Sequence, residues 1–169
     1  MGNALVPLPM GQDIVIPQRS GGASTYQLPP WIYPPPEFWP IDQIAYVALP
    51  AIGAAATVVS FQVPPGHNGI TLLYGNNFVG GGWTEGSAAV YWQFARDNAV
   101  IDGYDNILAS LGSPGNPVRH PSGFRIFENQ IISLVVFNTS VVLAGQLSGG
   151  RLCGWYYPKE YEDQNITTM

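Results

Sequence analysis

The chain has 169 residues, of which 46% are hydrophobic and 10% are charged, and its net charge at pH 7 is -5. The charged share is well below the average of about 25%, yet so hydrophobic a chain is not expected to be disordered. Its six basic residues are spread over the whole sequence, so they form no patch for phosphate groups and we expect no nucleic-acid partner. A neutral, partly apolar surface is typical of proteins that are covered by partner proteins.

The first residues contain no basic segment followed by an apolar run, which predicts that the chain has no signal peptide. No stretch reaches the roughly 20 apolar residues of a membrane helix, so we expect no membrane association. Cys153 is the only cysteine. No disulfide can form within the chain, and we expect it to fold in a reducing cytoplasm.

Residues 1–42 differ from the rest of the chain, and we expect them to form an extended arm. They contain nine prolines, and proline lacks a backbone donor and has a fixed φ. Such a segment favours polyproline-like backbone and excludes a helix or a central strand. Large apolar side chains lie between the prolines, and we expect them to make the contacts of the arm: Trp31, Ile32, Tyr33, Phe38 and Trp39.

The free energy of ordering the arm predicts where it lies. Fixing the backbone of roughly 40 residues costs tens of kcal/mol, at about 1–2 kcal/mol each. Burying five large side chains returns only about 8–15 kcal/mol. The arm must therefore lie along a large surface, on its own domain or on a neighbouring subunit, and we favour the neighbour.

Residues 43–158 are expected to form an all-β domain, an antiparallel β-sandwich or jelly roll of about seven or eight short strands. β-branched and aromatic runs alternate with Gly, Pro and Asn turns at regular intervals. The predicted strands are 57–63, 70–74, 88–96, 98–103, 124–127, 131–137, 141–147 and 151–157, with 148–150 separating the last two. The only helical candidates are a turn or two at 44–48 or 107–111. We expect residues 159–169 to be an acidic, solvated tail.

Reactive side chains are too few to predict a catalytic or metal site. His67 and His120 are the only histidines, each in a predicted Pro/Gly turn, without the paired spacing of zinc ligands. Cys153 falls in the last predicted strand, where a small buried hydrophobe is the ordinary interpretation. Asp102 and Asp105 belong to turn dipeptides. We expect no catalytic residue, no metal and no cofactor.

Three aromatic residues allow a different interpretation. Trp83, Tyr91 and Trp92 could stack on sugar rings, which would make the chain a carbohydrate-binding or glycan-cleaving module for host attachment. This alternative requires Trp83 or Trp92 to be exposed beside Asp97 or Asp102. Aromatic residues of a sandwich more often lie in its core or in an interface.

Several short motifs stand between residues 57 and 158. They are Val63-Pro64-Pro65-Gly66-His67, Tyr91-Trp92-Gln93-Phe94, Asp102-Gly103-Tyr104, Phe127-Glu128-Asn129-Gln130-Ile131, Leu134-Val135-Val136-Phe137-Asn138-Thr139 and Arg151-Leu152-Cys153-Gly154-Trp155-Tyr156-Tyr157-Pro158. In these motifs the chain resembles the small jelly-roll structural proteins of tailed bacteriophage virions. Those proteins decorate or cement capsids, or build neck and fibre parts.

The resemblance implies a non-enzymatic virion subunit that assembles in the host cytoplasm. Such subunits are homo-oligomers, often trimers, held together by sheet packing and by an extended terminal arm. The implied partners are other copies of the chain and the major capsid protein or other virion proteins. A capsid cement or decoration protein is favoured over a neck, collar or tail component.

Overall fold

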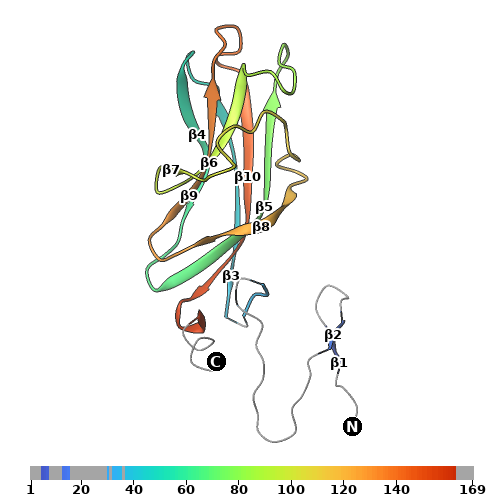
Figure 1. Cartoon of the computed structure of the whole chain (residues 1–169), viewed down its shortest axis with the longest axis vertical. Coiled ribbons are helices and arrows are strands. Elements are labelled where there is room, and N and C mark those ends of the chain that lie inside the picture. Colours follow the sequence, from blue (N-terminus) through green and yellow to red (C-terminus); the bar gives the residue numbers. More distant parts are fainter. Residues whose placement is uncertain (1–4, 8–12, 16–29, 31, 36, 163–169) are drawn as a thin grey trace, which may run out of the picture.

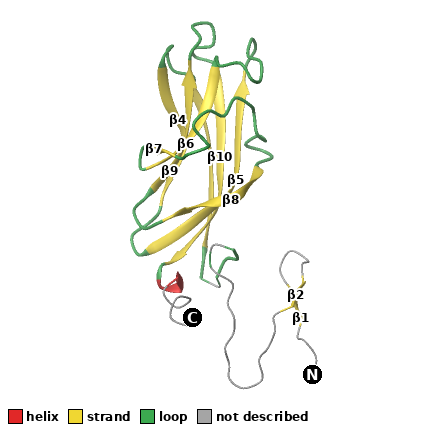
Figure 2. Cartoon of the chain, viewed as in Figure 1, coloured by secondary structure: helices red, strands yellow, loops and turns green. Residues whose placement is uncertain are grey.

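The computed structural model describes residues 5–7, 13–15, 30, 32–35 and 37–162, and these are almost entirely β-structure (Figure 1). The strands are β1 (Leu5–Pro7), β2 (Asp13–Val15), β3 (Trp39–Ala48), β4 (Ala54–Gln62), β5 (His67–Val79), β6 (Val90–Arg96), β7 (Ala99–Val100), β8 (Val118–Ile126), β9 (Ile131–Asn138) and β10 (Leu147–Pro158). A single helical turn, residues 160–162, follows β10 (Figure 2).

Two four-stranded antiparallel sheets pack against each other as a β-sandwich. One sheet, here called the β10 sheet, has the order β3-β10-β5-β8, and the other, the β9 sheet, has the order β4-β9-β6-β7. Successive strands change sheets at every step from β3 to β10, except at the β6–β7 hairpin. β1 and β2 pair with each other in a small separate sheet.

The core lies between the two sheets. Every second side chain of β6 and β9 is fully buried, as expected for strands with one face on a core. These side chains are Val90, Trp92, Phe94, Ile132, Leu134 and Val136. Ile41, Tyr74 and Leu152 of the β10 sheet belong to the same core.

The prediction of an antiparallel β-sandwich is confirmed. The predicted strands 57–63, 88–96 and 131–137 correspond to β4, β6 and β9, whereas 70–74 and 124–127 are parts of the longer β5 and β8. The predicted edge strand 98–103 is reduced to the two residues of β7. It joins β6 through a two-residue turn in which Asp97 and Asn98 have φ values of 51° and 66°, the combination that a tight hairpin requires.

The start of the sandwich was predicted wrongly. Residues 44–48, a helical candidate, belong to strand β3, which begins at Trp39, so the predicted arm boundary at residue 42 falls inside a strand. β3 is an edge strand of the β10 sheet. An edge strand tolerates Pro40 because the missing N–H can face away from the sheet. The other helical candidate, 107–111, is also wrong, since Ile107 forms an isolated β-bridge with Trp92.

The end of the sandwich also differs from the prediction. Residues 141–145, predicted as a strand, form a turn in which Val141 and Val142 are exposed. Gly149 and Gly150, predicted to separate two strands, lie inside β10. β10 is a central strand that pairs with β3 on one side and β5 on the other.

Candidate interaction site

The outer face of the β10 sheet carries a small buried cluster near the end of β10. Leu152 and Tyr156 pack with the core, so Trp155 and Tyr157, which alternate with them, belong to the opposite face. Ile70 stands opposite Trp155 in the pairing of β5 with β10. Ile70 and Tyr157 are only 2% and 0% exposed although neither belongs to the core between the sheets. Other segments must therefore cover them on the outer face.

The last part of the arm is one of the segments that lie here. The indole Nε1 of Trp155 donates a hydrogen bond of 2.6 Å to the carbonyl oxygen of Pro30. Pro30 and Pro35 are both buried. Pro30 thus contacts the outer face of its own sandwich before β3 begins at Trp39.

The residues after β10 are the other segment. The Glu162 carboxylate accepts hydrogen bonds from the Tyr157 hydroxyl at 2.6 Å and from Arg125 at 3.0 Å. Burial, the negative charge of Glu37 and a hydrogen bond to Glu37 raise the pKa of Tyr161. Tyr161 therefore joins the C-terminal turn to the arm, and both lie at the same end of the sandwich (Figure 1).

A second set of polar contacts fixes the C-terminal turn. The Lys159 Nζ lies 2.7 Å from Glu128 Oε2, and Glu128 Oε1 accepts from the backbone N–H of Gly66 at 2.7 Å. The hydrogen bond from Lys159 is the main reason why the pKa of Glu128 is lowered. The prediction of a solvated tail holds for Lys159 and Glu160, which are exposed, and is wrong for Tyr161 and Glu162, which are half-buried; the rest of the predicted tail lies outside the described residues.

The arm residues singled out from the sequence make few of these contacts. Trp31 lies outside the described residues, Ile32 is 60% exposed and Phe38 is 42% exposed, while Tyr33 is half-buried. Trp39 belongs to β3, where its ring stacks on Tyr156 at 5.4 Å. The contact between Pro30 and Trp155 was not predicted from the sequence. The available signal was that Trp155 alternates with the core-facing residues of the last strand and so lies on the outer face.

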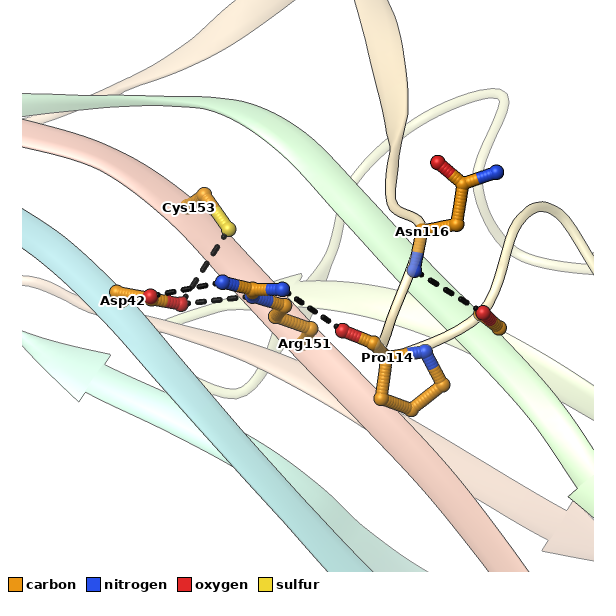
Figure 3. A network of polar contacts seen from close by, with 6 residues as sticks. Asp42, Pro114, Asn116, Arg151 and Cys153 are labelled. Carbon is orange, nitrogen blue, oxygen red and sulfur yellow. Dashed lines mark hydrogen bonds and ion pairs between the residues drawn. The ribbon is translucent and has the colours of Figure 1, made fainter.

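A polar network lies farther along the same outer face (Figure 3). Arg151 donates two hydrogen bonds to the Asp42 carboxylate, at 2.7 and 2.8 Å, and one to the carbonyl oxygen of Pro114 at 2.9 Å. The hydrogen bond from Arg151 lowers the pKa of Asp42. Burial is the main reason why the pKa of the Cys153 thiol is raised, so the thiol is protonated at neutral pH. Cys153 is half-buried on this face.

Exposed apolar side chains surround the Asp42–Arg151 pair. They come from β3, β5 and β10 and form what we call the apolar strip: Ile44, Tyr46, Leu73, Val79 and Leu147. Each is between 36% and 55% exposed. All five stand on the same alternation as Arg151 and Cys153, so they share the outer face of the β10 sheet.

The three candidate sugar-binding aromatics do not form a platform. Trp92 is fully buried in the core, and the ring of Trp83 packs edge-on against it at 5.5 Å. Tyr91 follows the opposite alternation of β6, and its ring stacks on Phe137 at 4.9 Å. Asp97 accepts a hydrogen bond from the backbone N–H of Ile131. The alternative of a sugar-binding platform is therefore wrong for Tyr91 and Trp92, because alternate residues of β6 face opposite sides of the sheet and Trp92 faces the core.

His120 lies in strand β8 and is 2% exposed, so its placement in a turn was wrong. Its Nδ1 lies 3.2 Å from the Tyr104 hydroxyl, and the rings of Phe124 and Tyr74 pack around it at 3.9 and 5.1 Å. Burial lowers the pKa of His120. A neutral ring held among aromatic side chains is a packing residue.

We expect this histidine to make the stability of the fold depend on pH. Below about pH 6.5 the unfolded chain binds a proton at His120, whereas the folded chain does so only at lower pH. The free energy of unfolding should therefore be highest above pH 6.5 and fall as the pH drops, by up to about 1.4 kcal/mol per pH unit from this group. Urea unfolding between about pH 8 and about pH 5 measures this slope. His120→Gln should flatten it, whereas the control His67→Gln should not; equal slopes in both variants would contradict the assignment.

Neither a cluster of metal-ligating side chains nor a membrane-spanning helix occurs in the described part of the chain. Within residues 30, 32–35 and 37–162 and the two short arm strands, no three His, Cys, Asp or Glu side chains gather as metal ligands would. The same residues contain no helix that is long and apolar enough to cross a membrane. Comparisons with protein-family models, with curated proteins and with solved structures found no match for this chain.

Proposed function

We propose that this chain is a non-enzymatic structural subunit of a virion, a capsid cement or decoration protein. The proposal rests on two features of the outer face of the β10 sheet. This face carries the apolar strip, and the last part of the arm is bound to it at Trp155. A subunit that holds other proteins together needs such surfaces and no reactive groups. The proposed partners are other copies of the chain, as a trimer, and the major capsid protein.

The sandwich is further proposed to be a jelly roll, and the nested pairing of its strands supports this. β3 pairs with β10, β4 with β9, β5 with β8 and β6 with β7, all antiparallel. The first strand of the domain thus pairs with the last, the second with the last but one, and so on inward. An eight-stranded ribbon of this kind, wrapped into two sheets, is the architecture of many capsid domains. Because the same fold also serves other functions, this likeness supports the role only together with the surface.

A neck, collar or tail component of the same particle is the alternative. It would use the same apolar face and the same arm, but at a single position of the virion. The number and location of the copies separate the two roles.

Immunogold labelling of particles tests the proposal. An antibody raised against the purified chain is expected to label the whole shell of particles from the organism that carries this gene. Label at one vertex or along the tail would favour the alternative. If no particle carries the protein, the proposed function is wrong.

A further inference from the structure

The Trp155 site has the features of a receptor for a proline-rich segment. An indole N–H that points out of a sheet meets a proline carbonyl at 2.6 Å, and two prolines of the bound segment, Pro30 and Pro35, are buried. Ile32 between them remains 60% exposed. The site therefore takes up backbone and proline rings, which is how aromatic-lined grooves bind polyproline-type peptides.

The bound segment is separable from the sandwich. The pairing of β3 with β10 begins at Trp39, opposite Tyr156, and residues 30 and 32–35 belong to no strand. Removing the segment from the site would break no ladder hydrogen bond of the two sheets. The contacts at Trp155 and Tyr161 could be made equally well by the same segment of another copy.

The site cannot favourably stay empty. Without a segment in it, the Trp155 N–H would lose its acceptor, and the surface against which Pro30 and Pro35 are buried would return to water. If the arm of one copy moves to a neighbouring copy, the Trp155 site of the first copy becomes empty. Only the same segment of another copy can fill this site with the same contacts. Exchange of a segment between copies meets this condition at little cost, since every contact is regained.

We propose that copies of this chain exchange arms at the Trp155 site, so that residues 30–37 of one copy bind the outer face of the next. This inference rests on the proposed function, in which the arm holds neighbouring subunits. Eight residues separate Pro30 from Trp39, and extended they span at most about 29 Å, enough to cross from one subunit to the next.

Cross-linking of mixed full-length chains tests the exchange. One chain carries Ile32→Cys and Cys153→Ser, and the other is the native chain, whose only thiol is Cys153 on the same outer face. The two are co-expressed and treated with a long, flexible bis-maleimide. Exchange predicts a cross-link between position 32 of one chain and Cys153 of the other, identified by mass spectrometry of the joined peptides. If Cys153 reacts poorly, Leu73→Cys replaces it, since Leu73 stands opposite Cys153 and is 36% exposed.

Two controls make the result specific. Val142→Cys, in place of Ile32→Cys, puts a 76% exposed thiol in the turn 141–145 at the far end of the sandwich, and should give no such cross-link (Figure 1). Trp155→Phe in the native partner keeps a ring but removes the N–H donor, and should lower the cross-link yield several-fold while the chain still melts cooperatively. The absence of a cross-link between position 32 of one chain and Cys153 of the other, or a yield that Trp155→Phe leaves unchanged, would overturn the inference. Because labelling of virions does not depend on which copy holds the arm, failure of the exchange and failure of the proposed function are distinguishable.

Discussion

Replacing Trp92 with alanine is expected to lower the free energy of unfolding by about 3–5 kcal/mol, the range for removing a large buried aromatic side chain. Trp92 is fully buried, and its Nε1 donates a 2.9 Å hydrogen bond to the Ser148 hydroxyl. Because Trp92 lies in the β9 sheet and Ser148 in the β10 sheet, this bond links the two layers of the sandwich. The variant loses the packing of the indole, the contact with Trp83 and this link. Urea unfolding followed by far-UV circular dichroism measures the change.

Tyr91→Ala is the matched control, because Tyr91 is the neighbouring aromatic residue of the same strand. Its ring is half-buried on the outer face and stacks on Phe137, so its loss should lower the free energy of unfolding by only about 1–2 kcal/mol. If Trp92→Ala prevents folding, Trp92→Phe gives a smaller version of the same test, with an expected loss of about 1–3 kcal/mol from the missing donor and volume. A Trp92→Phe variant as stable as the native chain would contradict the role of Trp92 as a link between the sheets.

The sequence predicts the sandwich well where a strand has one apolar and one neutral face. β6 follows this pattern, since Val90, Trp92 and Phe94 are buried and Tyr91 and Gln93 between them are half-buried. β9 is apolar on both faces and is recognisable as a short β-branched run between turns. The pattern cannot assign the apolar residues of β3, where Ala45 and Val47 pack against the core while Ile44 and Tyr46 are exposed on the other face. Apolar residues on both faces remove the alternation on which strand prediction depends. That same exposed face is the apolar strip, so the feature that obscured the strand is part of the candidate interaction surface.

From the sequence, only the existence of a contact surface for the arm was predictable. The conformational entropy lost on ordering the arm exceeds what its own side chains can offset, which indicates a large contact surface but does not say which residues make the contact. The pair that does so, Pro30 and Trp155, is separated by 125 positions in the sequence. Trp155 is recognisable as an outer-face residue only after the register of β10 is known. Glu162 likewise has a structural role because β10 carries the C-terminal turn back to Arg125 and Tyr157.

The glycines of β10 were predicted as a turn because local sequence does not report how closely other segments approach a strand. Gly150 faces the core, where an added Cβ would lie 2.8 Å from the Val58 side chain and 2.9 Å from the Leu134 side chain. At Gly149 the ring of Tyr46 lies over the strand. Glycine inside a strand marks such close approaches.

Gly154→Ala should therefore destabilise the fold strongly, at or above the upper end of the range of about 1–3 kcal/mol for overpacked sites. Gly154 lies at the irregularity in the pairing of β10 with β5. A Cβ there would overlap the carbonyl oxygen of Ile70 and lie 2.8 Å from the Thr71 Cα. Both are backbone atoms of the adjacent strand, so neither can move without separating β10 from β5. For a chain of this size a loss of about 3 kcal/mol lowers the melting temperature by about 6–12 °C.

Gly149→Ala, in the same strand, is the control. It tests whether the close backbone approach at Gly154 is the cause, or whether β10 tolerates no side chain at any of its glycines. The Cβ at this position would meet side-chain atoms, the Asn77 amide oxygen and the ring of Tyr46, and that ring is 55% exposed and free to turn towards solvent. Alanine also reduces the entropy of the unfolded chain, which offsets part of the crowding. We expect the melting temperature of Gly149→Ala to stay within about 3 °C of the native value, a free-energy change of at most about 1 kcal/mol. Similar losses in both variants would mean that β10 tolerates no side chain at either glycine, and the close backbone approach at Gly154 would then not be the cause.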